Sequence, residues 1–187
     1  TYYFRTKPVS FRPEIISAVS TLGHEIGYHY ENLADTNGDT TSAWHDFQAE
    51  LRRFDAWKPI RTIAMHGRPF SRWDNRDLWR SYDYRELGIA IEPYLDVDWG
   101  RTAYLTDTGG AWDSDTNMKD RPARSFPLPR RPRTTLDVVA LVPGLFCDIV
   151  LSVHPERWTD HPLGAVQAWA TDTAINAVKR VVGHLRQ

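Results

Sequence analysis

The sequence predicts an α/β fold, an incomplete (β/α)7-type barrel of parallel strands with its first strand or strands missing, formed by a single domain over residues 1–187. Short apolar runs suited to strands alternate with longer stretches suited to helices. Such alternation implies parallel strands joined by right-handed crossovers. Several runs also end on a histidine or a carboxylate, and parallel barrels carry their chemistry at the carboxyl ends of the strands.

Five runs show this ending: His24–His29, Thr62–His66, Gly88–Glu92, Ala103–Asp107 and Val150–His154. Because side chains alternate between the two faces of a strand, each run can be tested for where its last residue points. In four runs the ionisable residue shares a face with smaller residues and the bulkier residues take the other face. In the Asp107 run, Leu105 shares the face of the aspartate. The pattern predicts a bulky face packed on outer helices and a small face lining a narrow interior.

Helices are expected between these runs. Helical spacing of apolar residues, with suitable residues at the ends, indicates helices over Pro13–Leu22, Ser42–Trp57, Arg76–Leu87, Thr134–Val142 and Gly164–Leu185. An open doubly wound sheet is the alternative architecture. The barrel is favoured because the ionisable strand ends are spread over most of the chain, whereas an open sheet would concentrate them at one switch point.

Composition limits the class of protein and its partners. The chain is 41% apolar and 25% charged, which is typical of a globular domain. Its net charge of −1 provides no electrostatic basis for binding nucleic acid or an anionic membrane. No stretch is long and apolar enough to span a bilayer. We therefore expect neither a nucleic-acid partner nor a membrane span, and the sequence does not indicate an oligomeric state.

The beginning of the sequence indicates a fragment. The chain has no initiator methionine and opens inside an apparent strand, Thr1–Thr6. No signal peptide is visible, which slightly favours a cytoplasmic location. We expect these residues to be part of a longer catalytic domain that lacks its N-terminal strand here, so that the fragment by itself is expected to be nearly inactive.

Three histidines, His29, His66 and His154, stand at predicted strand ends and are expected to meet at the mouth of the barrel. Imidazole is a common zinc ligand, and a catalytic zinc needs three protein ligands and one open position for water. Such a metal lowers the pKa of its bound water to about 7, and a further histidine can protonate a leaving group. The histidines therefore predict a metal site with a nearby proton donor.

Two motifs resemble the polysaccharide deacetylase family of carbohydrate esterases. The segment Gly23-His-Glu-Ile-Gly-Tyr-His29 is similar to a Gly-His-Glu-Ile-Gly stretch that runs into a metal-binding histidine, which maps onto His29. The segment Leu151-Ser-Val-His154 is similar to a closing Leu-x-His element, whose histidine acts as general acid and maps onto His154. The resemblance implies an incomplete parallel barrel, a divalent metal, with zinc expected first, and an acetylated carbohydrate as substrate.

The chain also departs from the pattern of that family. The family usually supplies a second metal histidine four residues after the first, where this chain has Leu33. Its metal-binding and base aspartates lie on a strand that would precede Thr1. Its Arg-Pro element is loosely echoed by Arg68 and Pro69, so Arg68 is expected to orient the base. We conjecture that His66 takes the role of the missing histidine.

The sequence thus predicts a metal-dependent hydrolase that removes acetyl groups from an amino sugar or polysaccharide. His29 and His66 are the expected metal ligands, and His154 is the expected acid. The residues expected to contact the substrate are Glu92, Asp107, Trp112 and Trp158.

Two alternatives stay open. A glycoside hydrolase would use Glu92 and Asp107 as paired carboxylates, whose separation would distinguish retention from inversion of configuration. A non-catalytic carbohydrate-binding domain on the same fold is the other alternative, and Leu33 at the position of a metal ligand motivates it.

Overall fold

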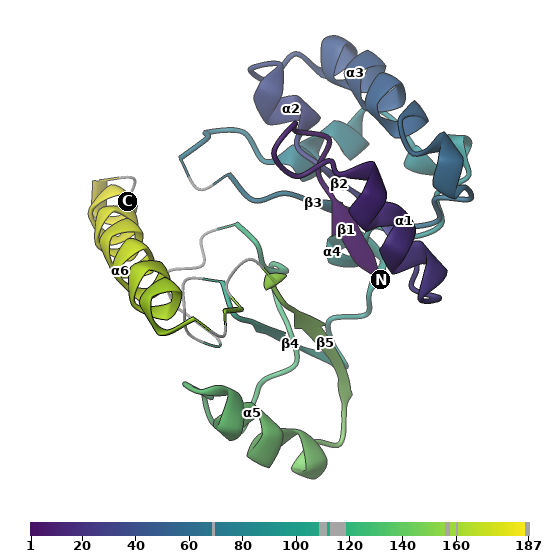
Figure 1. Ribbon diagram of the computed structural model, residues 1–187. Coiled ribbons are helices and arrows are strands. Elements are labelled where there is room, and N and C mark those ends of the chain that lie inside the picture. Colours follow the sequence, from purple (N-terminus) through teal and green to yellow (C-terminus); the bar gives the residue numbers. More distant parts are fainter. Residues whose placement is uncertain (69, 109–111, 113–118, 156–157, 160, 186–187) are drawn as a thin grey trace. The chain divides into compact units, whose positions relative to one another are not determined.

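The computed structural model describes residues 1–68, 70–108, 112, 119–155, 158, 159 and 161–185 of the chain (Figure 1). The chain divides into two compact units, Thr1–Val97 (unit 1) and Asp98–Gln187 (unit 2). The single domain expected over residues 1–187 stays a prediction.

The sheet of unit 1 consists of three parallel strands in the order β1 (Tyr2–Phe4), β2 (Ile26–Tyr30) and β3 (Ile63–Met65). In the register of β2 and β3, His29 lies opposite Ala64. One further bridge, from Thr62 to Ile91, extends the outer edge of β3. The predicted parallel pairing is confirmed for these strands.

Short-range signals explain where the helices of unit 1 begin. The helix α1 (Pro13–Thr21) starts with a proline, whose missing N–H is harmless in the first turn. The helix α3 (Thr40–Arg52) is capped by Asp39, whose carboxylate accepts from the N–H groups of Thr41 and Ser42. The remaining elements are α2 (Asn32–Asp35), α4 (Pro93–Asp96) and three 3-10 helices, η1 (Asp55–Trp57), η2 (Asn75–Arg80) and η3 (Tyr84–Leu87).

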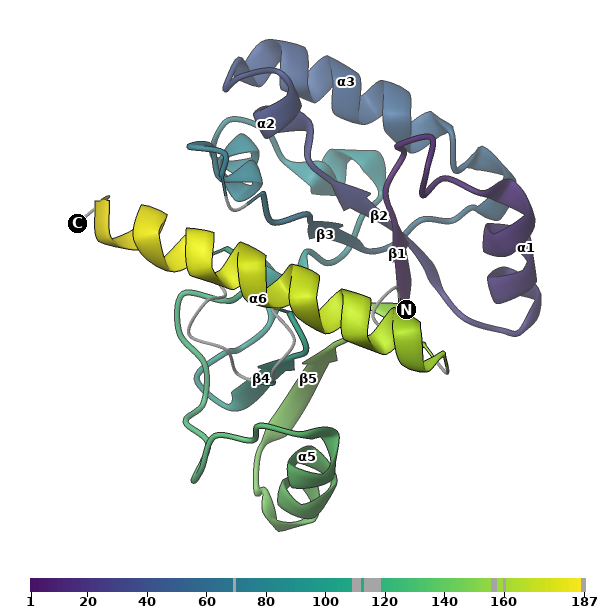
Figure 2. The same cartoon turned by 60° about the vertical axis from the view of Figure 1, so that its left-hand side comes forward.

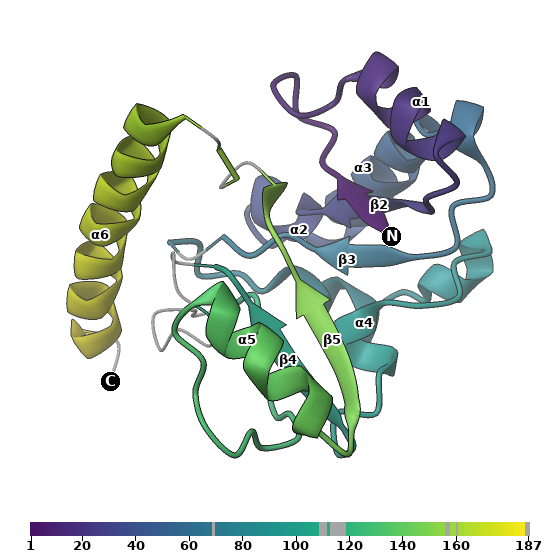
Figure 3. The ribbon, with the colours of Figure 1, turned by 60° about the horizontal axis from the view of Figure 1, so that its bottom comes forward.

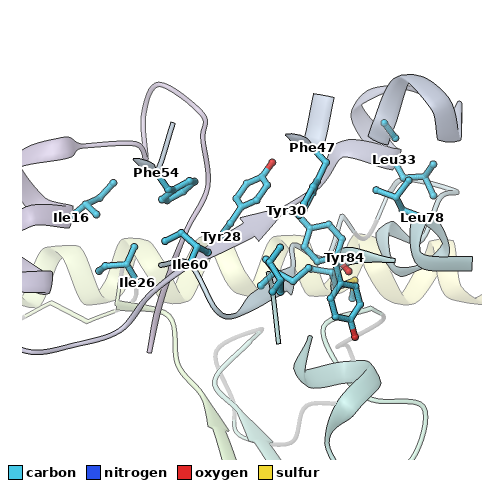
Figure 4. Packing of buried hydrophobic residues seen from close by; sticks show 14 residues of the cluster. Ile16, Ile26, Tyr28, Tyr30, Leu33, Phe47, Phe54, Ile60, Leu78 and Tyr84 are labelled. Atoms are coloured by element: carbon cyan, nitrogen blue, oxygen red, sulfur yellow. The ribbon is translucent and has the colours of Figure 1, made fainter. Parts of the chain in front are cut away.

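The core of unit 1 lies on one face of its sheet, between the strands and the helices α1 and α3 (Figure 2). On β2 this face carries Ile26, Tyr28 and Tyr30, all of them buried. Figure 4 shows Tyr28 and Tyr30 beside Phe47 of α3, and the ring centroids of Tyr28 and Phe47 are 5.2 Å apart. The expectation that the bulky face packs on helices is confirmed here. The opposite face keeps the alternate residues Gly27 and His29.

Unit 2 has two parallel strands, β4 (Thr102–Thr106) and β5 (Asp148–Ser152), with Thr106 opposite Ser152 (Figure 3). They are joined through α5 (Thr135–Leu141) and the 3-10 helix η4 (Val142–Gly144), and α6 (Pro162–Leu185) follows. A capping box formed by Thr134 and Asp137 starts α5. Within the described residues, no helix has the length and apolar character needed to cross a membrane, as expected.

The predicted barrel is wrong. The strands described form one sheet of three strands and one of two, and neither sheet closes. A barrel requires every strand to pair on both sides. Beyond β3 the predicted strand Gly88–Glu92 is reduced to the single bridge at Ile91. Gly88 adopts a left-handed backbone with φ of 78°, and Pro93 starts α4, so too few residues remain extended between them.

Two further elements differ from expectation. The predicted helix Arg76–Leu87 is two 3-10 helices, η2 and η3. Each is capped by an aspartate side chain: Asp74 accepts from the N–H of Arg76, and Asp83 from the N–H of Arg85. The last strand ends at Ser152, so His154 lies two residues beyond it. By contrast, α1, α3, α5 and α6 occupy the stretches in which helices were expected.

Candidate functional site

His29 and His66 meet at the carboxyl ends of β2 and β3. His29 Nε2 and His66 Nδ1 are 3.2 Å apart, and the two rings stand nearly perpendicular with centroids 4.9 Å apart. The register explains the meeting, because His29 pairs with Ala64 and the side chain of His66 recurs two residues later on the same face. The structure thus brings two of the three predicted histidines to one face and one edge, and the expected meeting of this pair with His154 stays a prediction.

The hydrogen bonds of this pair define the tautomer of His29. Its Nδ1 lies 2.9 Å from the carbonyl oxygen of Ala64, which can only accept, so Nδ1 carries the hydrogen. His29 Nε2 is then an acceptor, and the N–H at Nδ1 of His66 donates to it. We infer these hydrogen positions from the bonding pattern. A histidine that ligates a metal commonly donates its other N–H to a backbone carbonyl in this way.

The spacing of the pair also fits a metal. Two nitrogens bound at tetrahedral zinc lie about 3.3 Å apart when each Zn–N bond is about 2.0–2.1 Å. The observed 3.2 Å between His29 Nε2 and His66 Nδ1 is close to that separation. Among the residues described, no group of three or more histidine, cysteine, aspartate or glutamate side chains could hold a metal ion. The two histidines alone would supply two ligands, and a metal site at this place stays a prediction.

Buried polar contacts hold His66 in place. Its backbone N–H donates to the carbonyl of Tyr30 at 2.7 Å, and its own carbonyl accepts from Asn75 Nδ2 at 2.9 Å. Asn75 is only 2% exposed, and its Oδ1 accepts from the N–H of Ala34 at 2.9 Å. Asn75 thus ties the end of β3 to α2. The sequence did not single out this residue, because its two partners are distant in the chain.

Leu33, at the position of the expected second metal histidine, belongs to the core. Its side chain is 2% exposed and packs in the cluster that includes Phe47 and Leu78. The short helix α2 begins immediately after β2, so the residue four positions after His29 turns into the core. A histidine there would be buried among apolar side chains, which explains why this position suits leucine.

A cluster of ion pairs lies beside the histidines, at the same edge of the sheet. Glu31, 4% exposed, accepts two hydrogen bonds on Oε1 from Arg5, at 2.6 and 2.9 Å. Its Oε2 is buried and accepts no hydrogen bond, although Arg68 Nε lies 3.8 Å away. Arg68 bonds Asp35 at 2.6 Å, and Lys7 pairs with the same aspartate. Arg68 therefore holds carboxylates, and the role in orienting a base that was expected of it stays a prediction.

A cavity of about 720 Å³ opens next to His66. Its lining comes from α2, the turn after it and the segment after β3: Ala34, Asn37, His66, Gly67, Arg68, Phe70, Ser71, Arg72 and Trp73. Among the residues described, the lining contains two arginines, one histidine and the rings of Phe70 and Trp73, and no carboxylate. This cavity is large enough for a small organic ligand, of which sites typically have about 300–1,000 Å³.

His154 and Asp107 form a second pair, in unit 2. His154 Nδ1 lies 2.6 Å from Asp107 Oδ1, and the backbone N–H of His154 lies 3.1 Å from both oxygens of the carboxylate. The strands β4 and β5 run side by side, so residues just past their ends meet. Because a carboxylate accepts hydrogen bonds, Nδ1 of His154 carries a hydrogen, while Nε2 lies 3.5 Å from Thr108 Oγ1. This arrangement orients an imidazole for proton transfer.

The remaining predicted site residues are not brought to these pairs by any contact that the structure describes. Glu92 is completely buried, caps α4 through the N–H of Leu95 and accepts from the N–H of Met65 at 3.0 Å. Burial raises the pKa of Glu92 to about 7, although Arg76 and these N–H groups oppose the shift. Such a carboxyl group does not face a substrate, so it does not favour the glycosidase alternative. Trp112 Nε1 donates to Thr135, and Trp158 is 64% exposed.

Comparisons with models of protein families, with curated proteins and with solved structures found no match to this chain. The resemblance to the polysaccharide deacetylase family therefore depends on the two motifs alone, and it stays a prediction.

Proposed function

We propose that this chain is a metal-dependent hydrolase that removes acetyl groups from an amino sugar or polysaccharide, cleaving a carbon–nitrogen bond that is not a peptide bond. The approach of His29 Nε2 and His66 Nδ1 to 3.2 Å, from neighbouring strands, is the observation that carries the proposal. The similarity of the segment around His29 to a family motif supports the same chemistry.

His29 and His66 would hold the divalent ion, for which zinc is the first candidate. A bound ion of this kind lowers the pKa of its water to about 7 and polarises a carbonyl oxygen. His29 keeps its Nδ1 hydrogen on the Ala64 carbonyl and so keeps Nε2 directed at the site. His66 must move its hydrogen from Nδ1 to Nε2 before Nδ1 can act as a ligand. Asn75 holds the backbone of His66 while this exchange takes place.

The same proposal assigns His154, in unit 2, the role of general acid, as the resemblance of Leu151–His154 to the family motif implies. Its Nδ1 hydrogen is directed at Asp107, so a proton carried at Nε2 is the one available for transfer. The bonds from the backbone N–H of His154 to Asp107 keep the carboxylate in place as the imidazole changes charge. General acid catalysis by such a group contributes about 10²–10⁴-fold to rate.

Metal binding tests the proposal directly. Titration of the chain with Co²⁺, followed by its visible absorption and by calorimetry, should show one site that contains histidine nitrogen. His29→Ala and His66→Ala should each weaken binding at least about tenfold, since a ligand is removed. His24→Ala is the matched control, because His24 is exposed on the far end of the same segment and contacts the ring of Tyr2.

Acetate release from N-acetylated glucosamine oligomers tests the reaction in a longer protein that adds the upstream strand expected to carry the aspartates. Activity should disappear on chelation, return with Zn²⁺ or Co²⁺, and be lost in His29→Ala. Metal binding that is unchanged in both His29→Ala and His66→Ala would refute the ligand assignment. Activity that survives chelation would refute the metal mechanism and would favour a glycosidase.

A further inference from the structure

Trp73 lies between a glycine and an arginine, next to the cavity. Gly38 has φ of 88°, a backbone conformation that favours glycine, and a Cβ at this position would lie 2.4–2.6 Å from three atoms of the Trp73 ring. The guanidinium of Arg72 lies over the ring of Trp73, 4.4 Å from the ring centroid. The absence of a side chain at Gly38 is therefore what lets the indole lie flat against the loop and support Arg72.

This ring contact positions the exposed guanidinium of Arg72 without neutralising its charge. No carboxylate of the described residues pairs with Arg72, whereas Arg68, the other arginine of the cavity, pairs with Asp35 at 2.6 Å. Stacking on an indole leaves the N–H groups at the edge of a guanidinium available, because they lie in its plane. A planar fork of donors in a fixed position suits a carboxylate, which it can bind with two parallel hydrogen bonds.

The same cavity is lined by His66, the proposed metal ligand, and by the half-exposed ring of Phe70. One ligand could thus contact an apolar ring, polar side chains able to form hydrogen bonds, and a cation that no carboxylate neutralises. The polar side chains are those of Asn37 and Ser71. Neutral sugars need the ring and the polar side chains but not the cation. A cation held in place without a carboxylate indicates that the ligand brings a negative charge of its own.

We propose that the cavity binds an acidic sugar, an N-acetylated amino sugar that carries a carboxylate, and that Arg72 is the residue that selects it. This inference rests on the proposed deacetylase function for the position of the acetyl group, and it names the class of substrate. Arg72 binds the carboxylate, and Trp73 and Gly38 are positioning residues that act through Arg72.

Calorimetric titration without added metal tests the preference. The probes are N-acetylglucosamine and the matched 2-acetamido-2-deoxyglucuronic acid, which differ in having a hydroxymethyl or a carboxylate group on the ring. The acid should bind about tenfold more tightly, the gain of a hydrogen-bonded charged group. In Arg72→Gln the two sugars should bind equally. Arg80→Gln is the matched control, because Arg80 is exposed, pairs with Asp77 and does not line the cavity.

Two more variants separate selection from folding. Arg72→Lys keeps the charge but not the planar fork of donors. About half of the difference in log Kd between the two sugars should therefore remain. Gly38→Ala moves Trp73 and should reduce the preference while Arg72 is still present. His29→Ala, in which the proposed metal site is broken, should keep the full preference. The proposed substrate class can thus prove wrong while the proposed reaction is right. The proposed reaction can likewise prove wrong while the substrate class is right.

Three results would overturn the proposal. Equal binding of the two sugars by the unmodified chain is one, and a preference that persists in Arg72→Gln is another. The third is inorganic phosphate binding as tightly as the sugar acid, because that would reveal an anion site with no part for the sugar.

Discussion

Both units end a parallel strand pair with a histidine, but the partner of the histidine differs. In unit 1, His29 meets another imidazole at 3.2 Å, and in unit 2, His154 meets a carboxylate at 2.6 Å. A pair of imidazoles could exchange its N–H···N hydrogen bond for a metal ion between the two nitrogens, whereas a carboxylate partner fixes a hydrogen at Nδ1 and favours proton transfer. The same residue at the same kind of position is therefore suited to different chemistry by its neighbour.

The surroundings of the two histidines differ as well. Every residue of β2 except His29 is buried, while β5 has only exposed and partly exposed residues. Fourteen buried apolar residues form the cluster of unit 1, and it includes seven from its strands and α3. The histidine pair of unit 1 thus lies at the end of a buried sheet, which would suit the proposed metal site.

The largest expected effect is on the stability of this core. Phe47→Ala removes a fully buried ring that contacts Tyr28, Tyr30 and Trp79, and should lower the free energy of unfolding by about 3–5 kcal/mol. Leu141→Ala, in the sparser core of unit 2, should cost about 2 kcal/mol. Hydrogen exchange read residue by residue measures both. Faster exchange in β2 and β3 on Phe47→Ala is expected, and faster exchange confined to unit 2 would contradict it.

The next effect concerns pH and unit 1 alone. The pKa of Glu92 rises from 4.5 to about 7 because the carboxyl group is buried. The native state therefore binds a proton more tightly than the unfolded chain, and the resulting stability is present in full below pH 4.5 and is lost as pH rises through 7. The difference corresponds to about 3 kcal/mol.

Urea unfolding across that pH range, in the parent chain and in Glu92→Gln, measures this contribution. The glutamine cannot titrate, so the difference in unfolding free energy between the two proteins should change by about 3 kcal/mol from pH 4.5 to above 7. Glu86→Gln, at an exposed position of η3, serves as the control and should leave the slope unchanged. A parallel pair of curves for Glu92→Gln and the parent chain would disprove the assignment.

A smaller effect separates the two histidine sites. Asp107→Asn keeps the shape of the side chain, but its amide can donate a hydrogen bond to Nδ1 of His154 and so favours the other tautomer of the imidazole. Acetate release should therefore fall about 100-fold or more. Metal affinity should stay within about twofold, since the ligands of unit 1 are untouched. His66→Asn should do the opposite and weaken metal binding first. If Asp107→Asn lost the metal instead, the division of roles between the pairs would be wrong.

The smallest effect tests a local signal in unit 2. Thr134→Ala breaks the capping box with Asp137 and should cost about 1 kcal/mol. Protection of the first amides of α5 from hydrogen exchange should fall, whereas β2 and β3 should not respond. Thr134→Ser, which can form the same box, should restore most of the lost stability. Equal loss of protection in both units would show that they are not independent.

Much of the local structure could be predicted, because its causes lie within a few residues of the chain. Asp39 and Thr134 cap the helices that they precede, and Pro13 begins one. The alternation in β2 correctly separates His29 from Tyr28 and Tyr30, since side chains of a strand change face at every residue. The alternation of strands and helices likewise predicted parallel pairing.

Some site residues could not be found in this way. Arg72, Trp73 and Gly38 meet through a turn after α2 and a segment after β3, more than thirty positions apart. Asn75 is significant only because its side chain forms hydrogen bonds with the backbone of Ala34 and His66. Glu92, expected at an open rim, is instead enclosed as the cap of α4. In each case the property belongs to the neighbours rather than to the residue.

The sequence by itself determined most of the segments that become strands and helices, that the strands are parallel, and which face of β2 carries His29. It did not determine the segments Arg76–Leu87 and Gly88–Glu92, which form two 3-10 helices and a single bridge. Only the tertiary structure decided that the sheets stay open, that His29 and His66 come within 3.2 Å, and that Leu33 and Glu92 are buried. The reason is physical: caps and side-chain alternation act over a few bonds. Closure of a sheet, burial of a carboxyl group and the meeting of two imidazoles depend on free energies summed over residues distant in the chain.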